Sequence, residues 1–310
     1  MEIFSSHDFT DVQRQRMQEI ADCDVLHFFG EFEDDDHMPD EFPGCEVVFG
    51  NLPARWLTTT KTLQWKQLIS VGFGEYTHLD WSKLVRQITV TNLAGFFACP
   101  VAETALGGIL SLVRGIDELA RLKTGGDWQK DSLRERSRLL EDAAVVMVGF
   151  GSINRRLAEL LKPFHCHITT LRSRSTTADL EALLPDADIV VCAAPETDLT
   201  RGLFDAQRVA RMKHGAIFVN LGRGSIVDER ALEQGLQSGQ LGGAVLDVTD
   251  AEPLPEDHSL WQCPRTILTQ HTAGGTADEI DRKIEMFARN MRHYRAGEPM
   301  IGVVDWEKGY

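Results

Sequence analysis

The stretch Val145-Val146-Met147-Val148-Gly149-Phe150-Gly151-Ser152-Ile153-Asn154 decides the fold of this chain. Its first four residues are apolar and predict a buried parallel strand, the Gly-x-Gly sequence predicts a turn, and residues 155–161 continue with a helical pattern. A strand–turn–helix unit of this kind brings the backbone close to a pyrophosphate and points a helix N-terminus at it. A glycine-rich turn alone is often only a turn, so the prediction depends on the rest of the chain.

The residues of this turn have different expected roles in binding a dinucleotide. Gly149 would permit the tight turn, and Gly151 would permit the close approach of the phosphates. Asn154 stands where the fingerprint usually has its third glycine, so we expect the strand and the helix to pack slightly further apart. The cofactor contacts expected here are Gly149, Phe150, Gly151, Ser152 and Ile153.

The composition is that of an ordinary globular protein, with 43% hydrophobic residues, and a length of 310 residues suits two domains. A formal net charge of −15 argues against nucleic acid or an anionic membrane as a partner. The same charge gives no long-range attraction to a small anionic substrate. Local groups must therefore hold any such substrate.

Targeting signals and cysteine usage point to a cytoplasmic protein. The N-terminus lacks the basic start and apolar core of a signal peptide, and no apolar run approaches the length of a membrane span. The six cysteines are scattered without a Cys-x-x-Cys pair, which is typical of reduced thiols. In His165-Cys166-His167, strand alternation would place both histidines opposite the cysteine, so we predict no metal site.

The first ninety or so residues predict a small α/β domain. Short apolar runs separated by polar or amphipathic stretches predict strands at residues 25–29, 47–50, 68–72 and 88–92. The third of these runs ends in the glycine turn Val71-Gly72-Phe73-Gly74. Free backbone N–H groups in such a turn can bind a carboxylate, although a plain turn explains the local sequence equally well.

A long helix is expected over residues 101–122. Its first half, residues 105–113, is apolar or small on every side. A helix that is apolar all round is buried on all sides, and this favours a second subunit covering one face. We therefore expect a partner subunit to cover this helix, with a central helix of a monomer as the alternative.

From residue 144 onward, apolar strands alternate with helical patterns, which predicts a doubly wound parallel sheet. In such a sheet, ligands bind at the carboxyl ends of the strands. A helix is expected from Asp228 to Ser238. Further strands are expected at residues 168–171, 189–192, 217–220, 245–247 and 266–269. The ligand-binding rule then selects the loops that begin at Gly149, Arg172, Ala193, Leu221, Asp247 and Gln270.

The loop after the second strand indicates which nicotinamide cofactor is used. A domain selective for NAD carries an acidic residue there that accepts hydrogen bonds from the ribose 2′-hydroxyl. This chain has Arg172, Ser173 and Arg174 instead and no carboxylate. Guanidinium groups can bind a 2′-phosphate, so we expect this loop to bind NADP, with NAD as the alternative cofactor. A basic surface loop that binds no cofactor is the structural alternative.

Three residues of complementary chemistry follow three strand ends: Arg223, Glu252 and His271. An arginine can orient a 2-keto acid and polarise its keto oxygen, and a histidine can donate a proton to that oxygen as hydride arrives. A carboxylate bonded to the imidazole fixes its orientation and favours its protonated form. Each residue alone would more often be structural, but together they predict a catalytic site.

These motifs resemble the D-isomer-specific 2-hydroxyacid dehydrogenase family, particularly its glyoxylate and hydroxypyruvate reductase branch. The resemblance covers roughly residues 65–280 and depends on residues 149–153, 220–228, 246–255 and His271 with Gly274. It implies NAD(P)H-dependent reduction of a small anionic 2-keto acid to the D-2-hydroxy acid. The catalytic residues would be Arg223, Glu252 and His271.

The resemblance also implies how the domains and contacts are arranged. A flavodoxin-like substrate domain would comprise residues 1–96 and 275–310, and a Rossmann-type cofactor domain residues 97–274, with the active site in the cleft. The last helix, residues 277–294, would return to the substrate domain, and the helix over residues 101–122 would form a homodimer. The cofactor contacts would include Ala193, Ala194, Pro195, Leu221, Gly222, Asp247 and Gly274, with Asp247 near the nicotinamide amide. The substrate contacts would be Val71, Gly72, Phe73, Gly74, Arg223 and His271.

Departures from the family pattern leave alternatives open. Gln270 stands where the family usually has proline, and residues 73–76 are bulkier and more acidic than the usual substrate loop. Residues 73–76 would lie at the side-chain end of the pocket and affect substrate identity. A dinucleotide-sensing protein resembling the corepressors on this scaffold is a second hypothesis. A formate-type dehydrogenase is a third.

Overall fold

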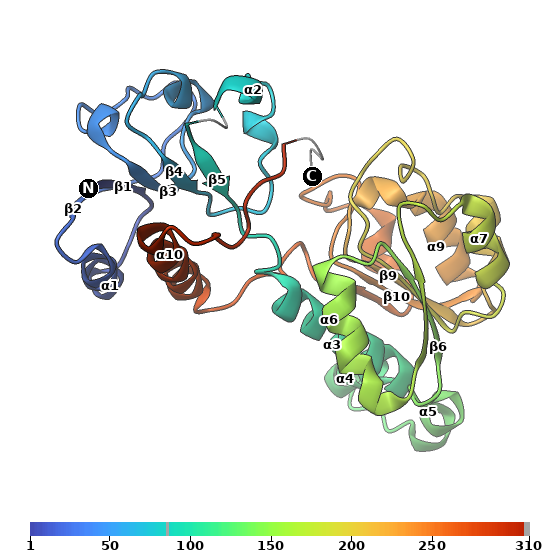
Figure 1. Ribbon diagram of the computed structural model, residues 1–310. Helices are drawn as coiled ribbons and strands as arrows, with labels where there is room; N and C mark the ends of the chain where they lie inside the picture. The colour runs from blue at the N-terminus through green and yellow to red at the C-terminus, as the bar shows by residue number, and fades with distance from the viewer. Residues whose placement is uncertain (85–86, 307–310) are drawn as a thin grey trace. The chain divides into compact units, whose positions relative to one another are not determined.

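The structure is a computed structural model that describes residues 1–84 and 87–306, and the chain divides into two compact units (Figure 1). Unit 1 comprises Met1–Phe96 and Thr276–Tyr310, and unit 2 comprises Phe97–Gly275. Each unit contains its own parallel sheet with helices packed against it. The predicted α/β class, with two parallel sheets, is therefore confirmed.

The sheet of unit 2 has the strand order β11-β10-β9-β8-β6-β7, and all its strand pairs are parallel. The expected strands are all present. The strand expected at residue 245 begins earlier, at Leu241, because Gly242 and Gly243 interrupt the apolar run that marks a strand. The bounds are β6 Ala144–Val148, β7 His167–Leu171, β8 Ile189–Cys192, β9 Ala216–Asn220, β10 Leu241–Leu246 and β11 Thr266–Leu268.

Two hydrophobic layers cover the two faces of this sheet. Alternate residues of each strand enter opposite layers, as Val145 and Val146 of β6 do. One layer contains α3 (Ala98–Arg114) and α6 (Ser152–Leu161), which pack against each other (Figure 1). The other layer contains α7 (Thr177–Leu183), α8 (Ala206–Arg211) and α9 (Glu229–Gln237).

The prediction of a single helix over residues 101–122 is wrong. The structure has two helices, α3 and α4 (Ile116–Gly125), which meet at 68°. Gly115 separates them with a left-handed φ of 67°, a conformation that ends helices. A short helix α5 (Lys130–Arg136) follows. Within the described ranges no single helix is long and apolar enough to cross a membrane, and only α3 and α4 taken together reach that length and composition.

The sheet of unit 1 has the strand order β2-β1-β3-β4-β5, and again all pairs are parallel. Helices α1 (Asp11–Ala21) and α10 (Glu279–Ala296) pack together on one face, and α2 (Trp81–Leu84) contributes to the layer on the other (Figure 1). The bounds are β1 Glu2–Ser6, β2 Val25–Phe29, β3 Val47–Gly50, β4 Trp65–Gln67 and β5 Thr89–Thr91.

The strand expected at residues 68–72 lies instead at Trp65–Gln67, and residues 68–72 form the loop that follows it. Two polar residues of β4, Lys66 and Gln67, are completely buried, so the pattern of apolar residues in the sequence does not indicate this strand. Lys66 Nζ donates to the Tyr76 hydroxyl at 2.7 Å. Burial lowers the pKa of Lys66 well below its ordinary value of 10.5, so the amine is held in its neutral form more readily than a lysine in water.

The C-terminal segment is integrated into unit 1. The buried Asn290 of α10 donates to Gln67 Oε1 at 2.9 Å and exchanges hydrogen bonds with the backbone of Ile301. Beyond the helix, Val304 N donates to the Val90 carbonyl at 2.9 Å. The last helix therefore packs in unit 1, although its expected start at residue 277 lies two residues before the observed one at Glu279.

Candidate active site

The loops that carry the expected site residues lie at one edge of the unit 2 sheet. Its six strands are parallel, so their carboxyl ends lie together. Adjacent loops are also joined by backbone hydrogen bonds, such as Gly149 N to Leu171 O at 3.0 Å and Leu221 N to Cys192 O at 2.8 Å. The fold thus gathers residues that are far apart in sequence.

The Gly-x-Gly turn has the shape that a dinucleotide requires. Gly149 has a left-handed φ of 78°, and a Cβ at this position would lie 2.8 Å from Ala194 Cα, so only glycine fits. A Cβ on Gly151 would meet open space among the described residues. No side chain from those ranges caps the N-terminus of α6, which leaves its first N–H groups directed at a possible anion.

Asn154 has a role that the sequence did not reveal. Its buried amide Nδ2 donates to the Val148 carbonyl at 3.3 Å and to the Gly149 carbonyl at 2.6 Å. The residue that replaces the third glycine therefore ties α6 to the end of β6 and fixes the turn. The wider spacing of strand and helix stays a prediction.

The basic loop after β7 lies beside this turn. The Arg172 guanidinium lies over the ring of Phe150, 5.0 Å from its centroid, and Arg172 N donates to Ser175 Oγ at 3.1 Å. Arg172, Ser173 and Arg174 are all exposed. The open space at Gly151, the uncapped helix N-terminus and these exposed polar groups fit a dinucleotide.

His271 and Glu252 form a hydrogen-bonded pair. His271 Nδ1 lies 2.7 Å from Glu252 Oε2, and the two side chains are 55% and 37% exposed. Partial burial alone would raise the pKa of Glu252, but hydrogen bonds from His271 and Thr249 N, together with the charges of His271 and Arg223, outweigh it and lower that pKa below 4.5. Glu252 is thus ionised near neutral pH. Nε2 is the nitrogen of His271 that can face a substrate.

Asp247 holds the loop that carries His271. Gln270 and His271 both have a left-handed φ, of 53° and 56°, which non-glycine residues rarely adopt without support. The Asp247 carbonyl accepts from His271 N at 2.7 Å. Its buried carboxylate accepts from Thr269 Oγ1 at 2.6 Å and from Ala273 N at 3.0 Å. Contact between Asp247 and the nicotinamide amide stays a prediction.

Arg223 is exposed and has an extended backbone. It lies between Gly222 and Gly224, two positions where no larger residue fits. A Cβ on Gly222 would lie 2.5 Å from the Ala194 carbonyl oxygen, and one on Gly224 would overlap the peptide between Thr249 and Asp250. These two tight contacts therefore fix the backbone on both sides of Arg223. Its Nη1 donates to the Gly222 carbonyl at 2.7 Å.

Asn220, which was not predicted as a site residue, orders this loop. Its buried side chain donates to the Arg223 carbonyl at 2.9 Å and accepts from Gly222 N at 3.1 Å. The available sequence signal was a polar residue ending an otherwise apolar strand.

The remaining predicted cofactor contacts lie beside the turn, in or next to the Arg223 loop, or next to Phe97. Ala194 is buried and packs against Gly149 and Gly222, whereas Pro195 is exposed and Ala193 is half-buried. Leu221 is buried in the core of unit 2, so only its backbone is available to a ligand. Gly274 faces Phe97, since a Cβ there would lie 3.0 Å from the ring.

In unit 1, the turn at residues 71–74 is only partly as expected. Val71, Gly72 and Gly74 are exposed, and the Val71 carbonyl accepts from Asn92 Nδ2 at 2.8 Å. Phe73 is 5% exposed in the hydrophobic core of unit 1, and its ring lies 5.2 Å from that of Trp306. The Phe73 side chain is therefore packed in this core, as is that of Tyr76, and the substrate contacts expected of residues 71–74 stay a prediction.

Comparison with known proteins identifies the family of the chain. Residues 106–273 match the model of the D-isomer specific 2-hydroxyacid dehydrogenase NAD binding domain, which is more than half of the chain. The chain belongs to the D-isomer-specific 2-hydroxyacid dehydrogenase family. The matched part includes Arg223, Glu252 and His271, the residues that the fold brings to one edge of the sheet.

Proteins named for different activities are similar to the chain. Formate dehydrogenase of Arabidopsis thaliana is 32% identical over 226 residues, which are 69% of this chain and 59% of that protein. Glyoxylate reductase of Thermofilum pendens is 28% identical over 98% of this chain and 88% of that protein. A D-isomer specific 2-hydroxyacid dehydrogenase of Xanthobacter autotrophicus, solved with NADPH and MES, has the same fold, with a TM-score of 0.77 at 23% identity and 99% coverage of both chains.

Proposed function

We propose that this dehydrogenase reduces a small 2-keto acid, of the glyoxylate or hydroxypyruvate type, to the D-2-hydroxy acid with NADPH as the preferred cofactor. The Glu252–His271 pair, with its 2.7 Å hydrogen bond, carries the proposal. An ionised Glu252 stabilises a protonated imidazole and holds it in one orientation, which is what a proton donor to a keto oxygen needs.

Each residue of the site has one task in this reaction. A reduced nicotinamide, when bound, supplies hydride to C2 of the keto acid. Arg223 holds the substrate carboxylate and polarises the keto oxygen, and His271 delivers its proton to that oxygen from Nε2. Glu252 keeps its charge throughout and balances the imidazolium. Binding of the substrate carboxylate by the N–H groups of Val71 and Gly72 stays a prediction.

The preference for NADPH is supported by the loop after β7. Arg172 is stacked on Phe150 beside the dinucleotide turn, and Arg174 is exposed in the same loop. Two guanidinium groups favour a ligand that carries an additional phosphate. NADPH in the Xanthobacter structure is consistent with this preference.

A homodimer through α3 and α4 is part of the proposal. The exposed side of these helices carries apolar groups, with Ile116 52% and Leu119 50% exposed, and Leu106 and Leu110 are only partly buried. A second copy of the chain would cover these groups. A cytoplasmic location is also proposed, since all six cysteines are unpaired.

Steady-state assays with purified protein test the proposal directly. NADPH and NADH oxidation is measured with glyoxylate, hydroxypyruvate, pyruvate and bulkier 2-keto acids, and NAD⁺ reduction is measured with formate. We expect turnover with a small keto acid and NADPH, and His271→Ala should lower kcat on the order of 10²- to 10⁴-fold. Tight cofactor binding without turnover would favour a dinucleotide sensor, and turnover of formate would favour a formate dehydrogenase.

A further inference from the structure

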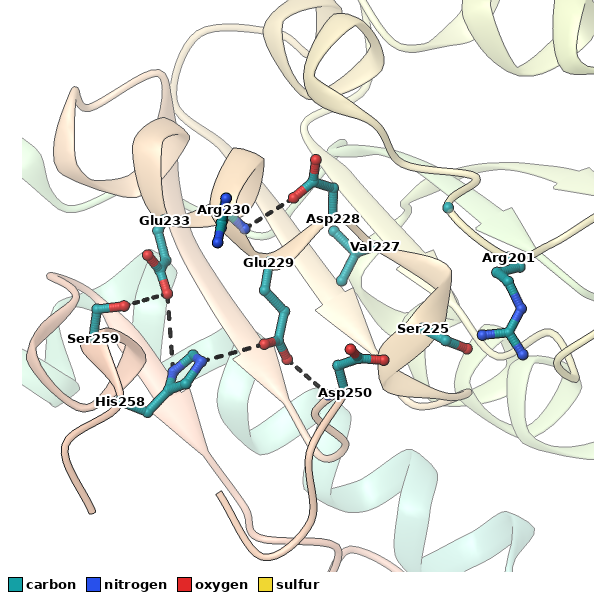
Figure 2. A pocket seen from close by; sticks show the side chains of 11 residues that line it. Arg201, Ser225, Val227, Asp228, Glu229, Arg230, Glu233, Asp250, His258 and Ser259 are labelled. Atoms are coloured by element: carbon teal, nitrogen blue, oxygen red, sulfur yellow. Dashed lines mark hydrogen bonds and ion pairs between the residues drawn. The ribbon is translucent and has the colours of Figure 1, made fainter. Parts of the chain in front are cut away.

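We propose that Glu229, outside the catalytic set, is a positioning residue that holds Glu252 in place by fastening both ends of the loop that carries it. This inference rests on the proposed function, since it concerns the same proton-donating pair. Glu229 is the first residue of α9 and lines a cavity of about 510 Å³ with Asp250 and His258 (Figure 2).

The first attachment lies just before Glu252. Asp250 N donates to Glu229 Oε1 at 2.8 Å, and Figure 2 shows this bond leaving the Glu229 carboxylate toward the loop. The neighbouring Thr249 N donates to Glu252 Oε1 at 3.1 Å. The backbone that Glu229 holds is thus immediately next to the backbone that orients the Glu252 carboxylate.

The second attachment lies at the end of the loop. The other carboxylate oxygen of Glu229, Oε2, lies 3.5 Å from His258 Nε2. His258 Nδ1 accepts from Leu260 N at 3.3 Å and faces Glu233 Oε1 at 3.9 Å, so the ring is held between two glutamates (Figure 2). One carboxylate therefore spans a segment of the chain, residues 250–258, that has no helix or strand of its own.

Two features show that this clamp is stiff rather than incidental. The Glu229 side chain is only 15% exposed, so packing limits the positions that its carboxylate can take. The Thr249–Asp250 peptide is also packed directly on Gly224, where a Cβ would overlap it. The peptide is thus fixed between the residue after Arg223 on one side and Glu229 on the other. Loosening it would move Glu252 relative to both His271 and Arg223.

The experiment compares Glu229→Ala and Glu229→Met, which remove both attachments, with Glu229→Gln, which keeps an acceptor for Asp250 N. We expect the first two to lower kcat by at most about 5- to 30-fold, the loss expected when the Glu252 charge itself is removed, because Glu229 acts through Glu252. The Kd for NADPH should stay within about twofold, because Glu229 does not reach the dinucleotide turn. Glu229→Gln should recover most of the activity.

A double-mutant cycle separates positioning from general stabilisation. In the Glu252→Gln background, Glu229→Ala should cost little further activity, because the group that it positions is already impaired. Arg230→Ala is the matched control, since Arg230 lines the same cavity but bonds there through its backbone N–H to Asp228 at 3.0 Å. Its kcat should equal that of the wild type.

The outcomes are distinct. Additive losses in the cycle, a parallel loss of cofactor binding, or failure of Glu229→Gln to restore activity would overturn the positioning role. Wild-type kcat in Glu229→Ala while Glu252→Gln is impaired would overturn the positioning role alone. Wild-type kcat in Glu252→Gln would overturn the positioning role together with the role of the Glu252–His271 pair. Absence of turnover of any 2-keto acid by the wild type would overturn the proposed function.

Discussion

Replacing Glu252 by glutamine tests the proton-donating pair most directly. Glutamine has the size of glutamate, and its carbonyl oxygen can still accept from Thr249 N, which donates at 3.1 Å in the wild type. What is lost is the negative charge 2.7 Å from His271 Nδ1 and, because the amide nitrogen of glutamine then faces Nδ1, the acceptor for an Nδ1–H group. The substitution therefore removes stabilisation of a protonated imidazole while leaving the shape of the loop in place.

The size of the effect follows from the exposure of the pair. A hydrogen bond to a charged group contributes about 1.5–3 kcal/mol and a neutral one about 0.5–1.5 kcal/mol, a difference of roughly 1–2 kcal/mol. At about 1.4 kcal/mol per tenfold change in rate, kcat should fall about 5- to 30-fold. Because the two side chains are 37% and 55% exposed, solvent screening places the expected value toward the lower end.

The pH dependence has a definite sign. The pKa of Glu252 is lower in the folded protein than the ordinary carboxyl value of 4.5. The stability that the Glu252 charge gives the folded loop is therefore fully present above pH 4.5. It is lost only as the pH falls through the lowered pKa. The wild type should therefore keep its activity down to pH values near 4.5 as far as Glu252 is concerned. Glu252→Gln should be impaired at every pH.

The assay is steady-state oxidation of NADPH with the best keto acid at saturation, together with the Kd for NADPH measured by fluorescence. Glu256→Gln is the control, since it removes an exposed carboxylate from the same loop. Unchanged kcat in Glu252→Gln across the pH range would refute the role of the pair. A loss of cofactor binding equal to the loss of kcat would also refute it.

Three further predictions concern other parts of the molecule. Arg172→Ala should lower kcat/KM for NADPH about 10- to 100-fold, as expected for loss of a charge-assisted hydrogen bond, with little change for NADH; equal losses for both would contradict the 2′-phosphate role. Glu in place of both Ile116 and Leu119 should convert the proposed dimer to monomers in light scattering. Lys66→Met should raise the free energy of urea unfolding at neutral pH, because burial of Lys66 lowers its pKa and the folded chain resists the proton that the unfolded chain binds. That gain should grow as pH falls below 10.5, since the unfolded chain then binds the proton that the buried Lys66 resists, and a gain independent of pH would contradict this account.

Much of unit 2 could be predicted from the sequence because its chemistry is local. Strands buried on both faces appear as continuous apolar runs, and the order of strands and helices then places every strand end at one edge of the sheet. The residue types after those ends, Arg223, Glu252 and His271, indicated the chemistry before any distance was known. Because the loops that carry His271 and Glu252 follow neighbouring strands, the two side chains are close enough to form their 2.7 Å hydrogen bond.

The sequence was least informative where polar groups are buried. Strand β4 was misplaced because Lys66 and Gln67 are inaccessible, their polar atoms being bonded to Tyr76 and to α10 more than 200 residues away. Gly115 looked like one more small residue within a helix, and only its left-handed backbone shows that it ends α3. A pattern of hydrophobicity records burial of apolar side chains and contains no signal for such partners.

The sequence by itself therefore determined the α/β class, the dinucleotide turn and the residue types of the site, because each depends on periodicity or on the properties of single residues. Only the tertiary structure decided how the site is held. Asp247 and Glu229 act through hydrogen bonds to backbone groups that lie in other loops. Such bonds depend on where the chain returns in space, and adjacent residues do not specify that.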